Sequence, residues 1–272
     1  MTPTNDARIR GVVFDWAGTI VDHGCFGPVV AFQEVFVRAG VPISVEEARV
    51  PMGLPKKDHL RTIAAMPEVM SRWEARYGKP FSENDLEELY AAFTGMQISV
   101  LKDHCGVIGG ASDVVAGLRE RRVRIGSTTG YVRAMMNEVI PRVEKQGLHV
   151  DAVVCADDVP SGRPHPWMAF RVMEQLGVYP PHACLKIGDT LPDVAEGRNA
   201  GMWTVAVIET GSDVGMTENE LRMLGADELQ SRSAEIARTL SAAGAHYVIP
   251  TVRELPALIE VIEQRLRQGD RP

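Results

Sequence analysis

The sequence contains little cysteine, and its four cysteines stand alone. Cys25, Cys105, Cys155 and Cys184 form no CxxC pair within the 272 residues. Isolated cysteines at these spacings argue against a structural zinc site and against a disulfide framework. We therefore expect most of them to be buried thiols.

Long hydrophobic runs and an excess of positive charge are also missing. No apolar run approaches the length of a membrane span, and the opening stretch MTPTNDARIR lacks the apolar core of a signal peptide. The formal net charge of -7 argues against a nucleic-acid groove, although an acidic protein can still carry a local basic pocket. We expect a cytoplasmic protein that binds a small molecule and neither a nucleic acid nor a membrane.

The composition of the sequence is that of an ordinary globular protein. Its first predicted element is one short strand. Its length of 272 residues suits one large domain or a domain with an insertion. The apolar, β-prone run Val12 to Phe14 is broken by Gly18, and Asp15 stands where the run ends. This pattern predicts a buried strand that delivers a carboxylate.

The stretch after this strand is predicted to be helical. Helices are predicted over residues 28–40, 55–66, 67–77 and 84–101. Ser44 and Glu47 have the spacing of a capping box for one more short helix. No convincing strand occurs between Asp22 and His104, so we interpret residues 22–104 as a helical cap inserted after the first strand.

From Gly109 onward, strands alternate with helices. Strands are predicted over residues 123–128, 152–155, 184–187, 203–207 and 247–249, with peripheral helices over 217–243 and a closing amphipathic helix over 254–267. This alternation is typical of a parallel sheet with helices on both faces. We expect an α/β fold, with a Rossmann-like, doubly wound core over residues 1–21 and 105–272 and the inserted cap.

Polar residues of complementary types follow several of these strands. The hydroxyls and amides of residues 128–131 suit phosphate oxygens, and a loop cation at Arg163 could neutralise them. Asp15, Asp189 and Asp193 could hold Mg²⁺, which prefers oxygen ligands. Each residue alone has an ordinary explanation as a turn, a helix cap or a solvated surface group. Their agreement in order and chemistry favours an active site beyond the carboxyl ends of the strands.

The order of these segments resembles the haloacid dehalogenase superfamily, whose members are Mg²⁺-dependent phosphoryl-transfer enzymes with an aspartate nucleophile. The stretches FDWAGT, PMGLPKKDH, GSTTGY, GRPHPWM and GDTLPD together resemble the phosphonoacetaldehyde hydrolase family over nearly the whole chain. The resemblance implies that Asp15 is the nucleophile and that Thr129 and Arg163 bind the phosphoryl group. It also implies that Asp189 binds the metal beside Asp15 and that Asp193 supports it.

Ala17 departs from the wider superfamily. Most of its phosphatases carry a second Asp two residues after the nucleophile, which protonates the leaving alkoxide. Here that acid is missing, and only the main-chain carbonyl of Ala17 is implied to meet the metal. A P–C bond offers a reason, because an amine can convert an aldehyde one carbon away into an iminium ion. The electron pair of the broken bond then leaves as an enamine.

That chemistry needs a lysine from the cap. Lys56 is predicted in the first turn of a helix, where we expect the helix dipole and the like charge of Lys57 to lower its pKa. His59 lies on the same helical face and is our candidate for proton transfer. A lysine in a cap helix is ordinarily solvated, and the residues alone leave Lys57 as an alternative amine. The match of PMGLPKKDH to the family selects Lys56.

The resemblance also implies pocket positions, a reaction and an assembly. Met52, Gly53, Cys25 and Tyr131 match residues that line the family pocket. The implied reaction is hydrolysis of phosphonoacetaldehyde to acetaldehyde and phosphate, by a homodimer formed through the caps. Two alternatives stay open. One is a Mg²⁺-dependent phosphatase or phosphomutase of the same fold, and the other is a non-catalytic binding or assembly protein, which has little reason to keep these carboxylates together.

Overall fold

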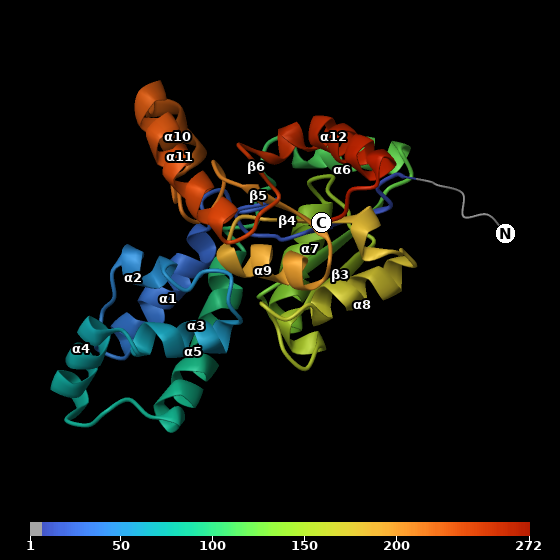
Figure 1. Ribbon diagram of the computed structural model, residues 1–272. Helices are drawn as coiled ribbons and strands as arrows, with labels where there is room; N and C mark the ends of the chain where they lie inside the picture. The colour runs from blue at the N-terminus through green and yellow to red at the C-terminus, as the bar shows by residue number, and fades with distance from the viewer. Residues whose placement is uncertain (1–6) are drawn as a thin grey trace.

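A computed structural model describes residues 7–272 of the chain (Figure 1). The strands are β1 (Gly11–Phe14), β2 (Arg124–Thr129), β3 (Ala152–Cys155), β4 (Cys184–Gly188), β5 (Trp203–Val207) and β6 (Tyr247–Ile249). The helices are α1 (Phe26–Arg38), α2 (Val45–Arg49), α3 (Lys56–Ala64), α4 (Pro67–Tyr77), α5 (Glu83–Leu101), α6 (Ala111–Glu120), α7 (Arg133–Glu144), α8 (Trp167–Leu176), α9 (Leu191–Asn199), α10 (Glu218–Met223), α11 (Ala226–Ala242) and α12 (Leu255–Gln268). Short 3₁₀ turns are η1 (Ala156–Asp158), η2 (Pro181–Ala183) and η3 (Val252–Glu254).

All strands join one parallel sheet in the order β3-β2-β1-β4-β5-β6. Helix α8 packs on β2 and β3, and α9 packs on β4 and β5. Helices α6 and α12 pack on each other on the opposite side of the sheet (Figure 1). With helices on both faces, the central strands are buried, which explains their continuous apolar runs. The predicted doubly wound α/β core is confirmed.

The sheet reverses its direction of growth between β1 and β4. The chain builds β1, β2 and β3 toward one edge, then returns to place β4 on the other side of β1. In such sheets the ligand site lies at this reversal, beyond the carboxyl ends of the two strands. Asp15 directly follows β1 and Asp189 directly follows β4, so topology brings both carboxylates to the same place.

Helices α1 to α5 follow β1 and pack on one another beside the sheet (Figure 1). Residues 22–104 contain no strand, as predicted. The apolar core runs without interruption from these helices into the sheet, since one cluster contains Phe32 and Phe93 together with Phe14 and Trp203. Residues 22–104 therefore remain our proposed cap, and its exact bounds remain a prediction.

Local features agree with the sequence pattern at most points. The capping box is present, because Ser44 Oγ accepts a hydrogen bond from Glu47 N (3.1 Å) and the Glu47 carboxylate accepts one from Ser44 N (2.8 Å). The first helix starts at Phe26, earlier than predicted, after Cys25 in a left-handed conformation with φ 54°. All four cysteines are buried and free, as expected.

No helix in the described part of the chain is long and apolar enough to cross a bilayer. The segment in which we expected no signal peptide, MTPTNDARIR, lies partly outside the described residues.

Candidate active site

A small cavity lies where the helical insertion meets the carboxyl ends of β1 and β2. Nine of the predicted site residues line it: Asp15, Ala17, Cys25, Met52, Gly53, Lys56, Thr129, Tyr131 and Arg163. The cavity holds about 20 Å³, little more than one water molecule needs.

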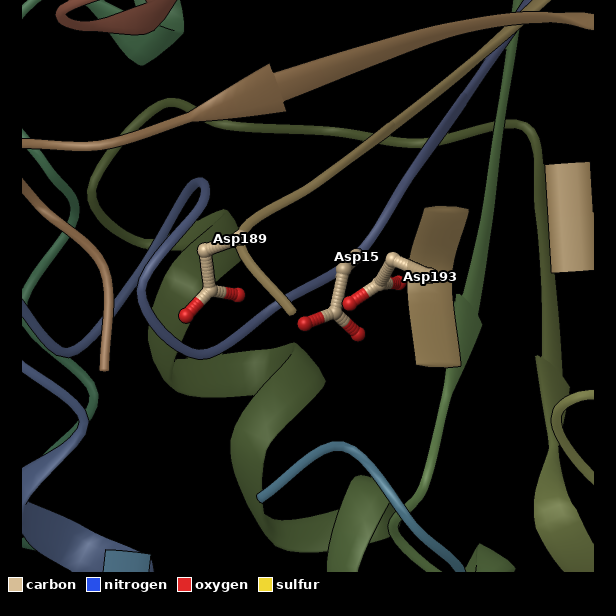
Figure 2. Close-up of side chains that lie close together, drawn as sticks. All are labelled: Asp15, Asp189 and Asp193. Atoms are coloured by element: carbon tan, nitrogen blue, oxygen red, sulfur yellow. The ribbon is translucent and has the colours of Figure 1, made fainter. Parts of the chain in front are cut away.

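Three carboxylates meet beside this cavity, and they come from three different elements (Figure 2). Asp15 follows β1, Asp189 follows β4, and Asp193 lies in the first turn of α9. Oxygen atoms of all three lie within 4.8 Å of one another, and all three side chains are buried. This arrangement confirms that the predicted carboxylates converge into a cluster that could hold a metal ion.

The three carboxylates differ in their electrostatic surroundings. Burial raises the pKa of Asp189 well above its ordinary value, and the charges of Asp15 and Asp193 raise it further. Burial also raises the pKa of Asp15, although Arg163 opposes that change. Burial acts in the same direction on Asp193, but the positive charges of Arg163 and Lys186 leave its pKa below the ordinary value. Asp15 and Asp189 therefore hold a proton more readily than ordinary aspartates do, because buried carboxylates lie close together there.

The turn after β1 brings the backbone close to Asp189. Val21 N donates to Trp16 O (3.0 Å) and Gly18 N donates to Val21 O (2.8 Å), which fixes the backbone on both sides of Ala17. Gly18 has φ +78°, and a Cβ atom there would lie 2.6 Å from Asp189 Oδ2. Only glycine fits this turn, because it tolerates both the conformation and the close approach.

Arg163 is buried, contrary to the ordinary expectation for a loop arginine. It is 3% exposed, and its guanidinium lies 2.6 Å from Asp15 Oδ1. The same terminal nitrogen donates to Thr128 O (2.9 Å). Thr129 follows in β2, and its hydroxyl accepts a hydrogen bond from Tyr131 N (3.1 Å). The structure thus brings both predicted phosphoryl-binding residues to the nucleophile candidate.

Two further residues, Lys186 and Glu196, contact these groups and were missed by sequence reasoning. Lys186 Nζ lies 2.6 Å from Asp193 Oδ1, and Glu196 Oε2 accepts a hydrogen bond from Arg163 Nε at 3.0 Å. The hydroxyl of Thr128 donates to Glu196 Oε2 at 2.9 Å. Lys186 interrupts the apolar strand CLKIG, and Glu196 stands three residues after Asp193 on one helix. A charge inside a buried strand and a carboxylate one helical turn away were the available signals.

Lys56 is the first residue of α3, and its side chain points into an aromatic environment. It is 4% exposed, and Nζ lies 5.0 Å from the ring centroid of Tyr131 and 5.3 Å from that of Phe32. Burial lowers the pKa of Lys56 to about 8. The lowered pKa agrees with our prediction, but the predicted cause differs. Lys57 is turned outward and forms an ion pair with Glu87, so burial, not like-charge repulsion from Lys57, dominates.

His59 shares the helical face of Lys56, but it does not line the cavity. Its ring is fully buried and stacks on Phe32 with 3.8 Å between centroids. Nε2 lies 2.8 Å from Ala48 O, which requires this nitrogen to carry the proton and donate. Burial and then the charge of Lys56 lower the pKa of His59 well below its ordinary value. His59 is therefore a neutral ring behind Phe32, and its role in proton transfer stays a prediction.

The remaining predicted pocket residues lie at the seam between the helices and the sheet. Gly53 has φ +89°, and a Cβ atom there would lie 2.2 Å from Thr190 Oγ1. Cys25 Sγ lies 3.5 Å from Asp189 Oδ2. The buried hydroxyl of Tyr131 has no hydrogen-bond partner among residues 7–272, which leaves it available to a bound molecule. Met52, 8% exposed, completes the wall beside Gly53.

Known proteins are similar to this chain in sequence and in fold. A profile of the haloacid dehalogenase-like hydrolases matches residues 9–201. The chain belongs to the haloacid dehalogenase-like hydrolase family. The matched region runs from β1 to the end of α9, and it therefore contains the three carboxylates and Arg163. Membership of this family makes the chain an enzyme and confirms the superfamily resemblance.

Individual relatives are similar to this chain over nearly their whole length. The phosphonoacetaldehyde hydrolase of Bacillus cytotoxicus is 46% identical over 258 residues, which cover 95% of this chain and 98% of the relative. That of Bacillus thuringiensis strain Al Hakam is 44% identical over the same shares of the two chains. A phosphonoacetaldehyde hydrolase-like protein from Oleispira antarctica has a similar crystal structure, with a TM-score of 0.96 and 36% identity over 97% of this chain and 96% of that one.

A more distant solved structure shows the fold alone. The β-phosphoglucomutase of Clostridium difficile is 16% identical, with a TM-score of 0.66 over 94% of this chain and 98% of that one. Its likeness supports the family fold and carries no information on the reaction of this chain.

Proposed function

We propose that this protein hydrolyses the P–C bond of phosphonoacetaldehyde to acetaldehyde and phosphate. The observation that carries the proposal is Lys56, a buried amine with a lowered pKa that lines the same cavity as Asp15. A phosphate ester has no use for such an amine, whereas an aldehyde reacts with it. The relatives named phosphonoacetaldehyde hydrolase support the same substrate.

Binding of the phosphonate depends on groups at the ends of β1 and β2. Arg163 offers a fixed cation, and Thr129 together with the backbone amides that follow it offers neutral donors. Arg163 now contacts Asp15, so a bound phosphonate exchanges one of those contacts for its own oxygen. Closing the insertion then excludes water and places Lys56 beside the aldehyde.

The carboxylate cluster fits a divalent cation. The cluster and its ion-pair partners comprise four carboxylates (Asp15, Asp189, Asp193 and Glu196) and two cations (Arg163 and Lys186). This set lacks two positive charges, and oxygen ligands suit Mg²⁺. Asp15, Asp189 and the carbonyl of Ala17 would hold the ion, with Asp193 in support. When bound, Mg²⁺ shields the negative charge that separates the phosphonate from Asp15.

The covalent steps divide between the cap amine and the core carboxylate. The neutral amine of Lys56 adds to the aldehyde, and the carbinolamine takes up one proton and loses water to form an iminium ion. A carboxylate oxygen of Asp15 attacks phosphorus in line with the P–C bond, which breaks, and its electron pair becomes the enamine C=C bond. The enamine carbon takes a proton to give the imine. Water then hydrolyses the imine to acetaldehyde and the aspartyl phosphate to phosphate.

The alternative is a Mg²⁺-dependent phosphatase or phosphomutase of the same fold. That reading needs an acid for the leaving alkoxide, and the cavity offers the methyl group of Ala17 at the superfamily position. It also leaves the burial of Lys56 without a use. Both features favour the P–C bond over an ester.

The two adjacent lysines allow a matched test of this proposal. Borohydride is added during turnover of phosphonoacetaldehyde, and the labelled lysine is located by peptide mass spectrometry. We expect an adduct on Lys56 in the unmodified protein, loss of adduct and turnover in Lys56→Arg, and retention of both in Lys57→Arg, because Lys57 pairs with Glu87 at the surface. Full turnover in Lys56→Arg, with no adduct in the unmodified protein, would reject the imine route.

Assembly and location are also proposals. Several apolar side chains of the insertion helices are exposed, among them Val30 (38%) and Val37 (56%) on α1 and Met70 (43%) and Tyr77 (41%) on α4. These residues support a homodimer formed through the caps. We propose a cytoplasmic enzyme of this kind, and sedimentation of Val37→Lys beside the unmodified protein tests the dimer.

A further inference from the structure

Beneath Asp15 lies a closed ring of four buried charges, Arg163, Asp193, Lys186 and Glu196, which we call the ion-pair ring. Arg163 lies 3.0 Å from Asp193 Oδ1 and 3.0 Å from Glu196 Oε2. Lys186 lies 2.6 Å from the same oxygen of Asp193 and 3.3 Å from the same oxygen of Glu196. None of the four residues is more than 3% exposed. Two positive and two negative charges therefore balance one another away from water.

The geometry of α9 allows this ring to close. Asp193 and Glu196 lie one turn apart on one face of the helix. A Cβ atom on Gly197 would lie 2.2 Å from Thr204 Cγ2 and 2.8 Å from Lys186 Cβ. The absence of a side chain at Gly197 thus lets α9 approach the sheet closely enough for both carboxylates to reach Lys186.

Stability alone is a weak reason for Glu196. Its Oε1 atom is buried without a hydrogen-bond partner among the residues that the structure describes. Buried ion pairs are often matched or exceeded in stability by apolar side chains of similar volume, because the charges lose their hydration. Oε2, by contrast, has three partners, and two of them are Arg163 itself and Thr128, whose hydroxyl accepts a hydrogen bond from Arg163; the third is Lys186.

We propose that Glu196 is a positioning residue for phosphoryl transfer and acts through Arg163. By accepting from Nε, it fixes the plane of the guanidinium, so that the terminal nitrogen faces Asp15 Oδ1 at 2.6 Å. Together with Lys186, it also keeps the ring neutral. The attraction between Arg163 and Asp15 then stays weak enough for Asp15 to attack phosphorus. The inference rests on the proposed function, in which Asp15 is the nucleophile.

Glu196→Gln keeps the size of the side chain and removes its charge. The ring then contains two positive charges, on Arg163 and Lys186, and one negative charge, on Asp193. The excess positive charge attracts the carboxylate of Asp15 more strongly. We expect kcat for phosphate release to fall about 10- to 100-fold, as for other supporting residues of active sites, with little change in KM. The imine step on Lys56 is expected to continue.

Borohydride trapping separates these steps. Hydride reduces the imine carbon to a secondary amine, so the adduct on Lys56 retains phosphorus if the P–C bond is intact and lacks it after cleavage. We expect phosphorus-free adduct to dominate in the unmodified protein and phosphorus-bearing adduct to dominate in Glu196→Gln. Equal proportions in the two proteins would overturn the inference.

A compensating double variant distinguishes positioning from packing. Lys186→Met combined with Glu196→Gln removes one charge of each sign and restores neutrality. We expect kcat of this double variant to be at least about three times that of Glu196→Gln, because the added electrostatic attraction on Asp15 is removed. A merely structural role predicts the reverse, with the double variant less active than the single one, and that result would also overturn the inference.

Thr128→Val decides the question if Glu196→Gln does not fold. This near-isosteric change removes the hydroxyl that donates to Glu196 and accepts from Arg163 at 3.1 Å, without altering charge. A lower kcat with more phosphorus-bearing adduct supports positioning, and unchanged values contradict it. If the unmodified protein forms no adduct on Lys56, the proposed function fails by itself. The ring is then judged on kcat for whatever phosphate ester the protein hydrolyses.

Discussion

At the scale of residues, the fold gives two adjacent lysines opposite environments. Lys56 is buried against Phe32 and Tyr131, and Lys57 pairs with Glu87 at the surface. Loss of hydration disfavours the ammonium form of Lys56, which is why its pKa falls to about 8. The difference lies in hydration and not in position along the helix.

The lowered pKa predicts the pH dependence of the reaction. The neutral amine forms the imine, and its fraction rises about tenfold per pH unit until the pKa is reached. We expect kcat/KM for phosphonoacetaldehyde to rise toward pH 8 and then to level off. Steady-state rates in buffers of constant ionic strength provide the measurement. A profile that is flat from about pH 6 to about pH 9 would contradict a titrating lysine.

Asp15 is predicted to act after the imine has formed. Asp15→Asn leaves the amine of Lys56 in place but removes the nucleophile, so we expect phosphate release to fall by about three orders of magnitude or more. Borohydride should then trap an adduct on Lys56 that retains phosphorus. Asp103→Asn, at an exposed position beyond α5, is the matched control and should match the unmodified protein. Phosphate release by Asp15→Asn at the normal rate would exclude the nucleophile role.

At the scale of elements, the loop before α3 packs closely on the core because the core has glycines, without side chains, at the points of contact. A Cβ atom on Gly162 would lie 2.8 Å from Pro55 Cγ, and one on Gly130 would lie 3.1 Å from Leu54 O. Pro55 directly precedes Lys56, and Gly162 directly precedes Arg163. This contact therefore sets the position of Lys56 relative to Arg163, the proposed phosphoryl-binding cation.

Adding one methyl group at this contact should misplace the amine. We expect Gly162→Ala to lower kcat/KM about 10- to 100-fold, because small displacements of reacting groups are costly. Gly117→Ala in α6 meets nothing within 4 Å and should leave activity unchanged. Rates of adduct formation on Lys56 in the two variants test this expectation. Equal rates would show that the contact does not position the lysine.

The two chain segments that join insertion and core are linked by one ion pair. His104 Nδ1 lies 3.5 Å from Asp22 Oδ1, and Asp22 has a left-handed φ of 53°. The hydrogen bond to Asp22 raises the pKa of His104. This contribution to stability is therefore present at pH values below the ordinary histidine pKa and is lost as pH rises through the raised value.

His104→Asn should remove that pH dependence. We expect the variant to be less stable than the unmodified protein near pH 6 and to differ less from it near pH 8.5, because the histidine is then neutral in both states. Urea unfolding at both pH values measures the difference. A stability difference that stays constant between them would show that the ion pair contributes nothing.

At the scale of the whole molecule, the excess of carboxylates over cations in the cluster predicts that a bound cation stabilises the fold. The ion-pair ring is neutral, which leaves Asp15 and Asp189 together with raised pKa values. A cation that binds only the folded protein stabilises it by about 2.7 kcal/mol at 100 times its Kd. We expect Mg²⁺ to raise Tm and a chelator to lower it. Asp189→Asn should raise Tm in the absence of Mg²⁺ and abolish the further rise of Tm on adding Mg²⁺. If Mg²⁺ raises Tm of this variant as much as that of the unmodified protein, the ion binds elsewhere.

Much of the fold follows from the chain alone. The strands β3, β5 and β6 and the helix α4 have the predicted bounds, because each is a short apolar or amphipathic segment limited by proline, glycine or polar residues. The candidate site residues at the ends of β1, β2 and β4 also followed from pattern, since parallel strands deliver their carboxyl ends to one edge. The roles of those residues depended on resemblance to a family.

The partners of the buried charges were not readable from local pattern. The positions of Lys186 in a strand and of Glu196 one turn after Asp193 hinted at burial, but only the packing of α9 on β4 brings them to Arg163. The physical reason is that periodicity reports which side of an element is apolar, whereas pKa values and ion pairs depend on groups far apart in the chain. The sequence by itself determined the elements and their order, and the tertiary structure decided which lysine is removed from water and which carboxylates lie closest to the cations.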